Sequence, residues 1–122
     1  MEMTKSFEDL KVWQKGHQFV LEVYKMSKAF PREEIYGLTS QFRRAAVSIT
    51  ANIAEGYKRK SAKEKLRFYN FSQASLEECR YFLILSKDLG YVENNKKQTV
   101  LIQEVSKMLN AYCQGILRKI NN

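Results

Sequence analysis

The sequence contains few of the residues that interrupt helices: one proline, Pro31, and five glycines among 122 residues. Because proline and glycine are the strongest helix breakers, their scarcity permits long uninterrupted helices. Apolar runs are also short, and none approaches the roughly 20 residues that a membrane-spanning helix needs. Residues 1–11 carry charges of both signs and no apolar stretch, so they do not resemble a signal peptide. We therefore expect a cytoplasmic protein with no membrane segment.

Residues that build catalytic and metal sites are scarce as well. Cys79 and Cys113 lie in helical patterns outside any CxxC or Cys/His cluster, which favours two small buried side chains over a redox or metal role. The single histidine, His17, falls on the apolar stripe of the first predicted helix, where a structural role is favoured. No Walker loop, GxGxxG, GxSxG or HExxH motif occurs. The sequence therefore predicts no enzyme, no cofactor and no metal site.

Four segments place apolar residues at three- and four-residue spacings, which is typical of amphipathic helices. They cover about residues 9–30, 38–57, 62–89 and 96–120. No segment shows sustained period-two alternation. Long helices joined by short loops predict antiparallel neighbours. We therefore expect an all-α fold, an up-and-down antiparallel four-helix bundle that forms a single domain over residues 1–122.

Local signals predict where the helices begin and end. Thr39 or Ser40 is a candidate N-cap of the second helix, and Gly56 is placed to end or bend it. Residues 61–64, Ser-Ala-Lys-Glu, fit a capping box at the start of the third helix. Gly90 is expected to end that helix.

Charge is the most informative part of the composition. Twenty-one Lys and Arg against 13 Asp and Glu give a net charge of +8, which favours a polyanionic partner such as nucleic acid, an acidic protein or anionic lipid. The densest cluster crosses the second predicted loop, and we call it the basic run: Lys58, Arg59, Lys60, Lys63, Lys65 and Arg67. Two interpretations stay open, a solvated surface or a phosphate-binding patch with Tyr57 as a stacking group.

A second polar feature lies on the second predicted helix. Four side chains at spacings of four, four and three share one face, and we call them the polar line: Arg44, Ser48, Asn52 and Glu55. Alanines beside them leave room for another backbone to approach. Two interpretations stay open. The polar line is a hydrogen-bond network that fixes the helix register or a subunit contact, or it is a ligand-facing row in which Arg44 contacts an anion.

Four blocks of the sequence are distinctive: FEDLKVWQK at residues 7–15, EIYGL at 34–38, QFRRAAVSITANIAEG at 41–56 and LGY at 89–91. Together they resemble the 23S rRNA intervening-sequence protein family, also called the four-helix-bundle protein family, and the block at 41–56 is the most distinctive match. Thr50 stands where the family often has proline. This departure predicts a straighter or better hydrogen-bonded second helix.

The resemblance implies a four-helix protomer that assembles into a ring-shaped homopentamer. Family members are encoded within segments inserted in bacterial 23S rRNA genes, or stand alone. A related branch is the accessory protein of diversity-generating retroelements, which partners a reverse transcriptase and binds nucleic acid. With the basic composition, this predicts a non-enzymatic bacterial homo-oligomer that binds structured RNA or DNA through the basic run, while the polar line holds the bundle or the ring together. The alternative is an oligomeric protein–protein interaction scaffold, such as a reverse-transcriptase accessory subunit, with no direct nucleic-acid role.

Overall fold

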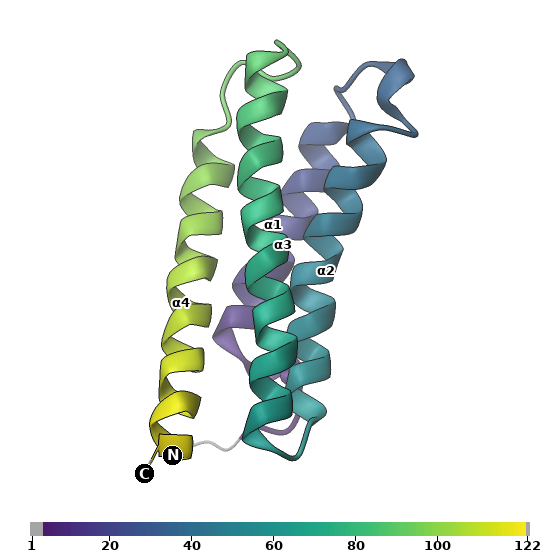
Figure 1. Ribbon diagram of the computed structural model, residues 1–122. Helices are drawn as coiled ribbons and strands as arrows, with labels where there is room; N and C mark the ends of the chain where they lie inside the picture. Colours follow the sequence, from purple (N-terminus) through teal and green to yellow (C-terminus); the bar gives the residue numbers. More distant parts are fainter. Residues whose placement is uncertain (1–3, 122) are drawn as a thin grey trace.

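The computed structural model describes residues 4–121, and these residues form four α-helices and no strand. The helices are α1 (Lys11–Ser27), α2 (Leu38–Lys58), α3 (Ala62–Asp88) and α4 (Lys96–Asn121), with short 3-10 turns η1 (Phe7–Asp9) and η2 (Arg32–Glu34). Figure 1 shows the four helices running alternately up and down one bundle. The predicted all-α, up-and-down four-helix bundle is therefore confirmed.

The predicted helix boundaries lie within three residues of the observed ones, and the largest difference is at α1. Residue 9 belongs to η1 because a capping box holds that turn. The Ser6 hydroxyl accepts a hydrogen bond from the Glu8 N–H at 3.2 Å, and the Asp9 carboxylate accepts from the Ser6 N–H at 3.2 Å. In such a box each of the two side chains accepts a hydrogen bond from a backbone N–H that has no helical partner. The helix proper therefore begins after Leu10.

The core lies along the axis of the bundle, between the four helices. Each helix contributes fully buried side chains, among them Phe19 from α1, Phe42 from α2, Leu76 from α3 and Leu109 from α4. Burial of one such side chain stabilises the fold by roughly 1.5–3 kcal/mol relative to exposure. The apolar spacings in the sequence therefore account for the bundle.

The helices α2 and α3 make the most extensive contact of any pair. The buried Ser72 hydroxyl donates to the Ile49 carbonyl at 2.7 Å. A Cβ added at Gly56 would lie 2.6 Å from Cε1 of Tyr69, so the glycine lets the Tyr69 ring lie against the α2 backbone. Of the two predicted roles of Gly56, ending or bending α2, the first is wrong, because the helix continues to Lys58.

The beginning of α2 is also capped differently from the prediction. Neither Thr39 nor Ser40 is the N-cap; instead the Glu34 carboxylate accepts hydrogen bonds from the Leu38 N–H at 3.1 Å and the Tyr91 hydroxyl at 2.8 Å. The bond from the Leu38 amide, followed by that from Tyr91, lowers the pKa of Glu34. This carboxylate joins the loop before α2 to the loop after α3.

Both predicted ends of α3 are confirmed. The Ser61 hydroxyl accepts a hydrogen bond from the Glu64 N–H at 3.1 Å. The other half of the predicted capping box is not among the bonds of the described residues, because the Glu64 carboxylate pairs with Arg67 instead. Gly90 has φ +78°, and the N–H groups of Gly90 and Tyr91 donate to two carbonyls of the last turn of α3, each at 2.9 Å. This is a Schellman motif, in which a left-handed residue closes the helix.

The prediction that His17 lies on the apolar stripe of α1 is wrong, because His17 is exposed. Its ring stacks on Trp13, with centroids 5.1 Å apart and planes 7° apart. The face that α1 buries is shifted by one residue toward the N-terminus from the position of His17, and it includes Val12, Gly16, Phe19 and Val23. An aromatic ring that is partly polar can lie at the rim of a helix interface.

Candidate nucleic-acid interface

One end of the bundle carries most of the net charge. At this end η1, the start of α1, the α2–α3 connection and the last turns of α4 come together (Figure 1). We call residues 4–11, 55–67 and 111–121 the basic end; they hold ten Lys and Arg and four Asp and Glu, a net +6 of the protein's +8. Residues 28–37 and 85–97, at the opposite end, hold five basic and four acidic residues. Such a concentration of one sign attracts polyanions.

The structure divides the basic run into two groups of three. The guanidinium of Arg59 pairs with Glu55 at 2.9 Å, and that of Arg67 pairs with Glu64 at 3.5 Å. Both pairs are exposed, so each contributes little to stability. Lys65 also interacts within the chain. These three side chains are already held by the bundle.

Lys65 closes the C-terminal end of α2. Its ammonium group donates to the Gly56 carbonyl at 3.2 Å and to the Tyr57 carbonyl at 2.7 Å. Carbonyls of a last helical turn have no helical partner, and a cation there also interacts favourably with the helix dipole. Burial lowers the pKa of Lys65. The role of Lys65 in the structure is therefore to cap the C-terminal end of α2.

The other group of the basic run is free to meet a ligand. Lys58, Lys60 and Lys63 are exposed and make no ion pair or side-chain hydrogen bond to the described part of the chain. They flank the short connection between α2 and α3. A polyanion can reach these three ammonium groups without the loss of an internal contact.

The polar line is also divided. The Ser75 hydroxyl donates to the Ser48 hydroxyl at 3.0 Å, so Ser48 joins α2 to α3. The Asn52 amide donates to the same Ser48 oxygen at 2.9 Å from within α2. Arg44 and Glu55, at the two ends, are exposed. Arg44 lines a groove of about 370 Å³ between α2 and α3. A subunit contact by the outer members stays a prediction.

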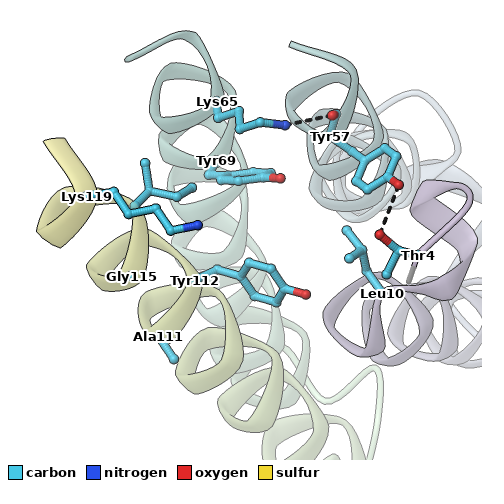
Figure 2. Close-up of a pocket in the computed structure, with 10 residues that line it drawn as sticks. Thr4, Leu10, Tyr57, Lys65, Tyr69, Ala111, Tyr112, Gly115 and Lys119 are labelled. Atoms are coloured by element: carbon cyan, nitrogen blue, oxygen red, sulfur yellow. Dashed lines mark hydrogen bonds between the residues drawn. The ribbon is translucent and has the colours of Figure 1, made fainter. Parts of the chain in front are cut away.

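A cavity of about 560 Å³ opens beside the basic run, and no pattern in the sequence predicts it. We call it the tyrosine pocket, because Tyr57, Tyr69 and Tyr112 line it together with Lys65, Lys119 and apolar side chains (Figure 2). No acidic side chain lines it. Its residues come from three helices and the segment before α1, so no local motif brings them together.

Residues 4–121 contain no cluster of three or more His, Cys, Asp or Glu side chains that could hold a metal ion. No helix in this range is long and apolar enough to cross a membrane. The predicted burial of Cys79 and Cys113 is confirmed, and desolvation raises the pKa of both thiols. Thiols react as thiolates, so both are chemically quiet.

Comparisons with known proteins agree with this architecture. Residues 8–111 match the model of a family described as 23S rRNA-intervening sequence protein. A solved structure from Bacteroides thetaiotaomicron, a protein of unknown function in the S23 ribosomal protein family, is similar with a TM-score of 0.62 and 19% identity. The match covers 91% of this chain and 99% of that one, and at this identity it shows the fold alone. No curated protein matches.

Proposed function

Because this chain belongs to the 23S rRNA-intervening sequence protein family, we propose that it is a non-catalytic, oligomeric cytoplasmic protein that binds structured RNA. The RNA backbone lies against the basic end. The observation that carries the proposal is the uneven charge, with a net +6 of the protein's +8 at one end of the bundle. The family name gives the reason to choose RNA among polyanions.

In this mechanism Lys58, Lys60 and Lys63 contact phosphates, and the held cations of the basic run add to the field around them. Each neutralised phosphate releases condensed counterions, so affinity falls steeply with salt. Contacts to phosphate position the RNA and carry little sequence information. The protein therefore recognises the shape of its RNA more than its sequence.

The oligomer in this proposal is the homopentamer that the family resemblance implies, which would carry a formal charge of +40 as five copies of +8. The outer face of α3 supports self-association, because Phe71 is 44% and Tyr81 is 56% exposed. Glu78, between them along α3, lines the same groove as Arg44. Exposed aromatic side chains are enriched at protein interfaces. Sedimentation of Phe71→Glu should show loss of the oligomer.

Fluorescence anisotropy with a structured rRNA fragment and a DNA duplex of equal length tests the proposed activity. The titrations run from about 50 to 200 mM salt, where phosphate binding typically falls by orders of magnitude. We expect binding with a steep salt dependence and a preference for the RNA. Absence of binding at low salt would contradict the proposal.

A protein-interaction scaffold is the second candidate function, and the exposed Phe71 and Tyr81 are the observation that favours it. Here α3 would dock a partner protein, such as a reverse transcriptase, and nucleic acid would be incidental. A partner that stays bound to the purified protein after nuclease treatment, and leaves on Tyr81→Glu, would favour this function over RNA binding.

A further inference from the structure

We propose that the tyrosine pocket captures one unpaired nucleobase, so that the basic end prefers RNA with a bulged or looped nucleotide over continuous duplex. The inference rests on the proposed RNA binding and names the feature of the RNA that is selected. It assigns a role to a cavity that lies beside the phosphate-binding lysines and is not explained by them.

The size and the walls of the pocket suit a planar aromatic ligand. A volume of about 560 Å³ lies within the range of small-molecule sites, roughly 300–1,000 Å³. The rings of Tyr69 and Tyr112 are 6.4 Å apart at 63°, so they do not stack on each other face to face. Tyr112 is 39% exposed. A base can stack on this ring, and such stacking tolerates any base.

The polar groups of the pocket match the edge of a base. The Tyr57 hydroxyl is hydrogen-bonded to Thr4 at 3.1 Å, whereas the hydroxyls of Tyr69 and Tyr112 have no partner within residues 4–121. Neither hydroxyl is among the fully buried unpartnered atoms of the described residues, so both are open to a ligand in the pocket. Burial raises the pKa of Tyr69 to about 12 and also raises that of Tyr112, so both phenols stay neutral. They can donate to or accept from a base.

The charge of the pocket matches the phosphate that accompanies a base. Figure 2 shows the ammonium group of Lys119 directed toward the space between the tyrosine rings, with Lys65 at the α2 side. Lys65 and Lys119 can meet the phosphate of the captured nucleotide, and the free lysines of the basic run lie at the α2–α3 connection, at the same end of the bundle. Base and phosphate are thus recognised by adjacent surfaces.

Gly115 keeps the pocket open. It lies within α4, and no atom is found within 4 Å of a Cβ added at this position. Glycine weakens a helix relative to alanine, and here close packing does not require it. A longer side chain at position 115 enters the pocket instead, which provides a direct way to fill it.

The test compares two RNA hairpins of equal length, one fully paired and one with a single unpaired 2-aminopurine nucleotide. Anisotropy measures affinity, and 2-aminopurine fluorescence reports stacking of the base. The wild-type protein should bind the bulged hairpin roughly 5- to 100-fold more tightly, the effect of one stacked base. Gly115→Leu and Tyr112→Leu should abolish the preference, while Tyr36→Leu, which changes an exposed tyrosine at the opposite end of the bundle, should retain it. The second substitution keeps the test valid if Gly115→Leu does not fold.

The outcomes separate this inference from the proposed function. Equal affinity for the two hairpins, unchanged in both leucine variants, would overturn the pocket assignment and leave RNA binding intact. If neither hairpin binds, titration with 2-aminopurine riboside monophosphate decides the case. Saturable binding that Gly115→Leu removes would show that the base comes from a free nucleotide, and no binding would overturn the assignment together with the RNA function.

Discussion

The contact between Gly56 and Tyr69 makes a sharp prediction about stability. A Cβ at position 56 would lie 2.6, 2.9 and 3.2 Å from three carbons of the Tyr69 ring. The ring is buried, and the open space beside it is the tyrosine pocket that it lines. Gly56→Ala therefore pushes the Tyr69 ring toward the pocket or forces α2 and α3 apart near the basic end.

Two effects oppose each other in this substitution. Overpacking of a core typically costs about 1–3 kcal/mol, and three close ring carbons place Gly56→Ala in the upper part of that range. Alanine is favoured over glycine within a helix by roughly 1 kcal/mol. We therefore expect a net destabilisation of about 1–2 kcal/mol, which lowers Tm by roughly 4–10 °C in a domain of this size.

Urea denaturation followed by circular dichroism measures the change in the free energy of unfolding. Gly115→Ala is the matched control, because it is the same substitution in a helix with no neighbour in reach, and it should stabilise by about 0.5–1 kcal/mol. In a Tyr69→Leu background the cost of Gly56→Ala should disappear. If Gly56→Ala stabilises the protein as Gly115→Ala does, the close approach is wrong.

Three further results are expected. Gly90→Ala should cost about 1 kcal/mol, measured by urea denaturation, because alanine disfavours φ +78°; no change would contradict the Schellman end of α3. The lowered pKa of Glu34 stabilises the fold above the ordinary carboxyl pKa, and this is lost as pH falls through the lowered value. Urea curves between pH 7 and 3 should therefore depend less on pH in Glu34→Gln, and identical pH dependence would refute the role of the Leu38 bond. Cys79 and Cys113 should react with a thiol reagent only after unfolding; rapid labelling of the native protein would contradict their burial.

The helices were predictable because apolar spacing and local caps are properties of short segments. The Ser61 cap and the Gly90 stop are such signals, and both are confirmed. The Glu34 cap of α2 was missed because the carboxylate reaches the Leu38 N–H from a 3-10 turn four residues earlier, not from the N-cap position. Gly56 was misread because its partner Tyr69 lies on another helix.

The sequence predicted that basic residues cluster at the candidate site, but it did not predict how their side chains are arranged. The sequence showed six basic residues together, and only the fold separates Lys65, which caps α2, from Lys58, which is free. The tyrosine pocket could not be predicted, because Tyr57, Tyr69 and Tyr112 come from three helices that meet only in the folded bundle.

The most direct test of RNA binding at the basic end is the salt dependence of affinity for Lys58→Gln/Lys60→Gln/Lys63→Gln, measured by anisotropy with the rRNA fragment. The matched control is Lys28→Gln/Lys87→Gln, which removes exposed charge at the opposite end. The triple variant should lose up to three phosphate contacts, so the slope of log affinity against log salt should flatten by about 2–3 while the oligomer stays intact. The control should keep the wild-type slope. Equal slopes in all three proteins, or loss of the oligomer in the triple variant, would contradict the assignment.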